Sequence, residues 1–180
     1  MTEARAIEGC RRNDRISQKY LFDKWSEGML MVCMRYVKHL PDAEELMLAG
    51  FFSFFKTIDR FIYSNEAGMA AWLKKIMVNE CLMHLRKKGA LKIVEIEHAE
   101  ELATDESGLA KMSAGELFKL VMTLPEGYRT VFNLHIVEGY SHKEISALLG
   151  ISEGTSKSQL SKARVQMQTL LKQKENYYEK

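Results

Sequence analysis

The residues best suited to bind a ligand lie near the C-terminus. From Ser141 to Lys174, six basic residues stand against two acidic ones, a net +4 in a chain whose total is +2. At 3.6 residues per turn, one helical face without a carboxylate would carry Lys157, Ser158, Ser161 and Lys162. Ammonium groups pair with phosphates, and hydroxyls donate or accept hydrogen bonds at base edges. This face predicts contact with nucleic acid, and an ordinary solvated helix face is the alternative.

A second cluster with similar chemistry lies between Trp72 and Lys88. It has one acid, Glu80, and five cations: Lys74, Lys75, Arg86, Lys87 and Lys88. Asn79, in the same stretch, offers both a donor and an acceptor to an unpaired base. Such a surface is typical of proteins that hold single-stranded nucleic acid.

A helix-turn-helix would position the C-terminal face. Ser141 and Glu144 form a capping box that begins a short helix, and Gly150 suits the left-handed conformation that ends it. Ser152 is the expected N-cap of a longer helix, from about residue 153 to 174. The second helix of such a motif enters the major groove of DNA.

The rest of the chain favours an all-α fold. Apolar residues recur at three- and four-residue steps nearly throughout, hydrophobic content is 46%, and only two prolines occur, Pro41 and Pro125. We expect Asp42 to cap one helix, Tyr63–Gly68 to form a polar loop, and Pro125 to lie in the first turn of a later helix.

Composition divides this helical chain into two parts. Residues 89–112 are acidic and weakly periodic, and periodicity resumes at Ser113. The prediction is therefore two small helical domains, residues 15–88 and 113–174, joined by a flexible acidic linker at 89–112. By its composition alone, the linker is a solvated tether.

Three further segments of the sequence resemble a known family. They are Leu124–Phe132, Glu138–Ile145 and Gly154–Arg164, which are similar to the C-terminal domain of extracytoplasmic-function (ECF) sigma factors. In the N-terminal half, Asp42–Leu46 resembles the polymerase-binding segment of that family, and Trp72–Leu82 with Leu85–Lys87 resembles its promoter-opening helix. The resemblance covers most of the chain, in the family's order.

The resemblance implies a role for each matched residue. Core RNA polymerase, through its clamp and flap regions, would be one partner, and the clamp contact is implied for Asp42, Glu44, Glu45, Leu46 and Phe51. The loop Tyr63–Gly68 and the helix from Trp72 would open and read the minus-ten element, with DNA contacts at Asn79, Lys74, Lys75, Arg86 and Lys87. The duplex minus-thirty-five element would be read by Lys157, Ser158, Ser161 and Lys162, with Arg164 and Thr155 at phosphates or caps. An anti-sigma factor is a further partner of many family members. The resemblance also gives the linker an alternative to the tether, in which it threads into a basic nucleic-acid channel of the polymerase and its carboxylates mimic RNA phosphates.

Several positions depart from the family pattern. Leu48-Ala49 replaces the usual Gln-Glu, Met83 often an aspartate, Ser156 the usual valine and Gln159 an arginine. These changes bear on polymerase affinity and promoter sequence.

Other candidate sites are weak. Cys81 and His84 have half of a zinc-site spacing, but structural zinc needs four ligands. Cys10 stands beside Arg11 and Arg12, which would lower its pKa, in a terminus expected to fray. We predict no metal, no cofactor and no catalytic site, so the chain is not an enzyme.

The expected location is the cytoplasm. Three widely spaced cysteines suit a reducing compartment, and no signal peptide or membrane-spanning stretch is evident. The alternative to a sigma factor is a helix-turn-helix regulator whose N-terminal half senses a ligand or dimerises. An enzyme with a DNA-binding appendage is a third reading, without a catalytic motif to support it. Neither the promoter sequence nor the inducing signal follows from these residues.

Overall fold

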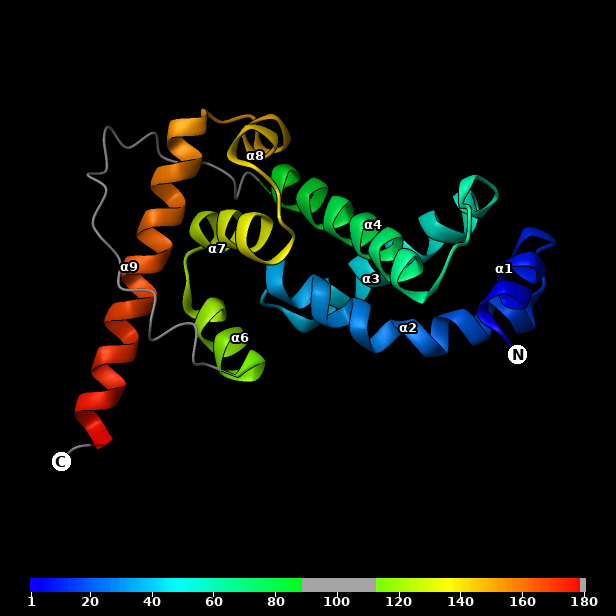
Figure 1. Ribbon diagram of the computed structural model, residues 1–180, viewed down its shortest axis with the longest axis horizontal. Coiled ribbons are helices and arrows are strands. Elements are labelled where there is room, and N and C mark those ends of the chain that lie inside the picture. Colours follow the sequence, from blue (N-terminus) through cyan, green and yellow to red (C-terminus); the bar gives the residue numbers. More distant parts are fainter. Residues whose placement is uncertain (89–112, 179–180) are drawn as a thin grey trace. The chain divides into compact units, whose positions relative to one another are not determined.

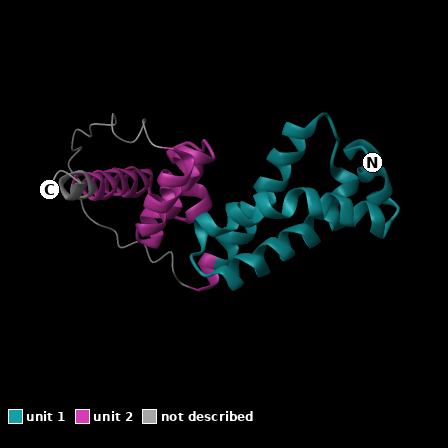
Figure 2. Cartoon of the chain, turned by 90° about the horizontal axis from the view of Figure 1, so that it is seen from below, with its two compact units in different colours: residues 1–84 teal, residues 85–180 magenta. Residues whose placement is uncertain are grey.

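The computed structural model describes residues 1–88 and 113–178, which contain helices and connecting turns and no strand (Figure 1). The predicted linker, residues 89–112, lies outside the described residues. The chain divides into two compact units, Met1–His84 and Leu85–Lys180 (Figure 2). The all-α fold predicted from the sequence is confirmed. In the described ranges no helix combines the length and apolar composition needed to cross a bilayer.

The first unit is built from four helices and a short 3-10 turn. These are α1 (Glu3–Arg11), α2 (Arg15–Tyr36), α3 (Leu40–Thr57), η1 (Ile58–Arg60) and α4 (Glu66–Lys87). Helix α3 packs along α2, since the rings of Phe22 and Phe51 are 4.8 Å apart. Helix α4 packs on α3, where the Phe54 and Trp72 rings are 5.3 Å apart.

The start of α3 corrects a prediction. Its N-cap is His39, without a capping bond from the side chain, so Asp42 is not the cap and lies in the first turn. Proline is favoured there because it lacks the N–H that a first turn leaves unpaired, and Pro41 occupies that position. The Asp42 carboxylate faces the His39 ring instead, with 3.1 Å between Oδ1 and Nδ1.

The N-terminus is ordered, against the expectation of a frayed end. Thr2 caps α1, and Ala6, Ile7 and Cys10 are buried against α2. Burial, with a smaller contribution from Asp14, raises the pKa of Cys10 to about 11, the reverse of the lowering predicted from its arginine neighbours.

The second unit packs shorter helices on the long C-terminal one. They are α6 (Ala114–Thr123), α7 (Glu126–Phe132), the short π-helix η2 (Asn133–Val137), α8 (His142–Leu149) and α9 (Glu153–Tyr178). Pro125 is the N-cap of α7 rather than a first-turn residue. Gly139, with φ +78°, turns the chain away from η2 toward α8.

Candidate nucleic-acid interface

The helix-turn-helix is held by the caps that the sequence predicted. The Ser141 hydroxyl accepts the Glu144 N–H at 3.2 Å, and the Glu144 carboxylate accepts the Ser141 N–H at 2.8 Å. Gly150 ends α8 in the left-handed region at φ +69°. Ser152 accepts the Thr155 N–H at 2.9 Å and begins α9. The tight turn therefore fixes the start of α9 relative to α8.

Burial along α9 separates an inner face from an outer one. The inner face consists of the buried residues Ser156, Gln159, Leu160, Ala163 and Met167. On the outer face Lys157 is exposed, and the other three predicted DNA contacts, Ser158, Ser161 and Lys162, are half-exposed. The structure therefore brings the four predicted residues together on one accessible surface, the reading face of α9, and the exposed Glu153 lies one turn before Lys157 at its edge.

The two remaining C-terminal candidates lie differently. The Thr155 hydroxyl is 2.9 Å from the Ser152 hydroxyl, so Thr155 takes part in the cap of α9. Arg164 is half-exposed and follows Lys157 by seven residues, which places it on the same side of the helix two turns further along.

A pair of histidines supports the start of the motif. The rings of His135 and His142 stack with centroids 4.3 Å apart and planes 15° from parallel. His142 Nδ1 lies 2.8 Å from the Ser156 hydroxyl, and His135 Nδ1 lies 2.8 Å from the Tyr140 carbonyl oxygen. Burial lowers the pKa of His142, and the positive charges of Lys157 and Arg164 act in the same direction.

Two departures from the family pattern point into the unit. Ser156 is fully buried and reaches His142, so this hydroxyl has an internal hydrogen-bonding role in place of valine packing. Gln159 is 6% exposed, and its Oε1 has no hydrogen-bond partner among the described residues.

Helix α4 presents an outer stripe that begins in the first unit and continues past the unit boundary at His84. Lys75, Asn79, Met83 and Arg86 recur at three- and four-residue steps and are exposed, as are Lys87 and Lys88. Glu80, the acid between Trp72 and Lys88, is turned toward α3, where it accepts the Ser53 hydroxyl at 2.9 Å. The exposed stripe therefore carries cations and an amide without a carboxylate. Lys74 is half-exposed beside it.

The loop before α4 covers residues 61–65, so the predicted polar loop Tyr63–Gly68 is wrong in its second half, because residues 66–68 belong to α4. The Phe61 ring is stacked on Trp72, with centroids 4.4 Å apart and planes 8° from parallel. Ile62 is 87% exposed, and the Asn65 side chain caps α4 by accepting the Gly68 N–H at 2.8 Å.

The predicted polymerase-binding residues do not form one surface. Leu46 and Phe51 are 7% and 2% exposed and belong to the core, so neither side chain is available for the clamp. Glu44 and Glu45 are exposed, and Asp42 is half-exposed, with His84 Nε2 3.8 Å from its Oδ2.

Two apolar residues that were not among the predicted polymerase-binding residues lie beside those carboxylates. Leu48 and Phe52 are 54% and 70% exposed and stand one turn apart, in register with Glu44 and Glu45. The signal was present in the phase of the helix: Phe51 follows Met47 by four residues and points inward, so Phe52 points outward.

The candidate zinc pair has other neighbours. Cys81 is buried beside the Cys33 thiol. The hydrogen bond between these two thiols, together with burial, raises the pKa of Cys81. His84 approaches Asp42. Residues 1–88 and 113–178 contain no cluster of three or more His, Cys, Asp or Glu suited to hold a metal ion.

Comparison with known proteins matches both units. The family model for sigma-70 region 2 matches residues 21–90, and the model for sigma-70 region 4 matches residues 114–167. The two matches fall on the predicted minus-ten and minus-thirty-five parts of the chain. A ligand-sensing or dimerising regulator, the alternative from sequence, does not account for the region 2 match.

Individual relatives extend over most of the chain. An ECF RNA polymerase sigma factor, SigM, of Mycobacterium tuberculosis is 30% identical over 162 residues, 88% of this chain and 79% of that protein. The ECF RNA polymerase sigma-E factor of Salmonella typhimurium is 22% identical over 91% of both chains. The sigma factor RpoE of Bartonella quintana, solved in complex with the anti-sigma factor NepR, shares the fold with a TM-score of 0.50 and 24% identity over 86% of this chain and 96% of that one. The family matches and the relative at 30% identity together show that this chain belongs to the ECF family of RNA polymerase sigma factors.

Proposed function

We propose that this sigma factor divides promoter reading between the two basic helix faces described above. The reading face of α9 binds the duplex minus-thirty-five element, and the outer stripe of α4 with the loop 61–65 holds the unpaired minus-ten strand. The observation that carries the minus-ten assignment is the orientation of Glu80. Its hydrogen bond with Ser53 turns the acid away from the outer stripe of α4. A surface cleared of carboxylates attracts the phosphate backbone.

The sigma factor directs core RNA polymerase to promoters and has no catalytic role of its own. The residues proposed for the clamp contact are Glu44 and Glu45 with the exposed Leu48 and Phe52, in place of Leu46 and Phe51. Apolar side chains at the centre with charges around them are the usual anatomy of a protein interface. We place this promoter recognition in the cytoplasm, where the polymerase and the chromosome are. An anti-sigma factor, as in the Bartonella complex, is proposed as a further partner.

The test of the minus-ten assignment is Asn79→Ala. The variant is expected to bind core polymerase and closed promoter DNA but to open the strands poorly, because an unpaired base loses its amide partner. Permanganate reactivity of promoter thymines measures opening directly, and a template with a pre-melted bubble should partly restore transcription.

The matched control is Gln18→Ala, which removes a half-exposed amide from α2. It is expected to open the promoter normally. Normal thymine reactivity in Asn79→Ala would remove Asn79 from the opening mechanism, and loss of core binding would give it a structural role.

A further inference from the structure

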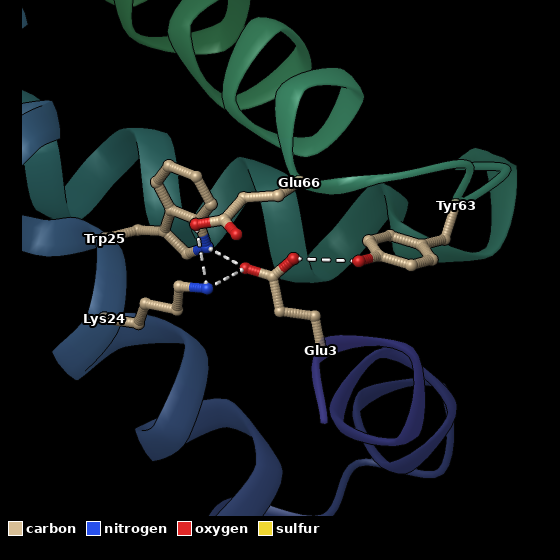
Figure 3. A network of polar contacts seen from close by, with 5 residues as sticks. All are labelled: Glu3, Lys24, Trp25, Tyr63 and Glu66. Atoms are coloured by element: carbon tan, nitrogen blue, oxygen red, sulfur yellow. Dashed lines mark hydrogen bonds and ion pairs between the residues drawn. The ribbon is translucent and has the colours of Figure 1, made fainter. Parts of the chain in front are cut away.

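Helix α1 begins with a buried carboxylate, Glu3, which contacts other elements of the first unit. Glu3 is 7% exposed and has three donors around it (Figure 3). The Trp25 indole N–H lies 3.1 Å from its Oε1, the Lys24 ammonium 2.8 Å from the same oxygen, and the Tyr63 hydroxyl 3.0 Å from Oε2. Lys24 also reaches Glu66, the first residue of α4, at 3.0 Å. Glu3 thus joins α1 to α2 and to the loop, and Lys24 extends this network to α4.

A second contact ties α1 to the same loop. Arg11, at the other end of α1, donates from Nη2 to the carbonyl oxygen of Phe61 at 2.7 Å, a bond between residues 50 positions apart. Phe61 is in turn stacked on Trp72 of α4. The two ends of α1 therefore contact the loop at Phe61 and at Tyr63.

These contacts decide which loop residues face outward. Residues 61–65 have no regular secondary structure, so no helical hydrogen-bond ladder sets their conformation. Phe61 and Tyr63 are held against α1 and α4, while Ile62 between them is 87% exposed and Ser64 is exposed. With Phe61 and Tyr63 held by these contacts, Ile62 and Ser64 are presented to the outside.

We propose that α1 is a brace that sets the shape of the loop 61–65, with Glu3 and Arg11 as positioning residues for minus-ten recognition. The inference rests on the proposed function, in which this loop holds the minus-ten strand. A loop held in its binding conformation loses less entropy when DNA binds. Without the Glu3 carboxylate, the Tyr63 hydroxyl and the Trp25 indole N–H lose their acceptor, and the loop samples conformations that do not fit the base.

The brace can be loosened in two independent ways. Glu3→Ala removes the carboxylate. Gly9→Ala adds a Cβ that would overlap the Ser17 hydroxyl and approach the Ser17 Cβ to 2.7 Å, which pushes α1 off α2 without touching the loop. Glu27→Ala, an exposed carboxylate on α2, is the matched control.

Holoenzymes carrying each variant would be assayed for open-complex formation on promoters with single substitutions in each element. In both brace variants we expect discrimination among minus-ten bases to fall roughly three- to tenfold, the loss from ordering one or two side chains on binding. Discrimination at the minus-thirty-five element should be unchanged, as should both in Glu27→Ala. Equal effects on both elements, or none beyond the control, would overturn the brace.

A second readout does not depend on DNA. Amide hydrogen exchange in the free protein should rise across residues 61–65 in Glu3→Ala and Gly9→Ala, and Glu3→Gln, which keeps an acceptor and a donor, should recover part of the protection. Unchanged exchange contradicts the brace. If exchange rises but Ile62→Ala and Ser64→Ala leave minus-ten discrimination intact, the brace stands and the minus-ten role of the loop fails.

Discussion

Lys162 and Arg164 are close in sequence but meet DNA at different depths if α9 enters the major groove. Recognition helices read bases mainly with their N-terminal residues, and Arg164 lies two turns beyond Lys157. Lys162→Ala should therefore weaken binding to a cognate duplex by roughly 1–3 kcal/mol and relax preference at one or two bases. Arg164→Ala should weaken all sequences alike and flatten the salt dependence. Fluorescence anisotropy on duplex variants at several salt concentrations measures both, and identical sequence-independent losses would show that Lys162 does not read bases.

His142 gives the second unit a pH dependence. Its pKa in the folded chain is below the ordinary 6.5, so unfolding takes up a proton between the two values. The contribution of His142 to the free energy of unfolding is therefore present in full above the unfolded pKa of 6.5. It is lost as the pH falls from 6.5 through the lowered value of the folded chain. Hydrogen exchange of the α8 amides should speed up, relative to α3, when the pH drops from about 7.5 to about 5.5 after correction for intrinsic rates.

The histidine replacement provides the check on this assignment. His142→Gln should flatten the response, because glutamine does not titrate and can still reach the Ser156 hydroxyl. His39→Gln, at an exposed site in the first unit, should leave it unchanged. An unaltered response in His142→Gln would assign the effect to another group.

At the scale of elements, the turn between α8 and α9 depends on one backbone conformation. Gly150 has φ +69°, which costs a residue with a Cβ about 1–2 kcal/mol. No atom lies within 4 Å of a Cβ added there, so Gly150→Ala would test conformation alone. We expect the second unit to lose about that much stability in urea unfolding and the affinity for duplex DNA to fall with it. Asparagine, which tolerates the left-handed region better, should restore part of both, and a fully stable Gly150→Ala would contradict the reading.

The same elements show how far the sequence predicts the structure. The limits of α8 and the start of α9 could be read from Ser141, Gly150 and Ser152, because capping is local chemistry. Helix α1 could not, since Ala6, Ile7 and Cys10 form a recognisable apolar face only when α2 is there to cover them. Phe51 and Phe52 are the same residue type, so only the phase of α3, in which Phe51 follows the buried Met47 by one turn, separates the buried ring from the exposed one.

At the scale of the whole molecule, the acidic segment at residues 89–112 separates the two parts of the chain that match sigma-70 regions. Its sequence still supports a prediction. Neutralising Glu95, Glu97, Glu100 and Glu101 together should leave binding to an isolated minus-thirty-five duplex unchanged but alter initiation or early escape, if the segment occupies a basic channel of the polymerase. Abortive and full-length transcripts would be counted over a range of salt. Wild-type transcription throughout that range would leave the segment as a tether.

Because all three cysteines are buried, the native chain should react little with thiol-directed labels. Cys10, Cys33 and Cys81 are 2%, 0% and 0% exposed, and maleimides react with an accessible thiolate. A cysteine placed at an exposed lysine of each unit, Lys19→Cys and Lys172→Cys, would then be the reactive pair without removal of any native residue. A donor and an acceptor dye on that pair would follow, one molecule at a time, how far apart the two units stand before the polymerase binds, while the promoter opens and after the sigma factor is released.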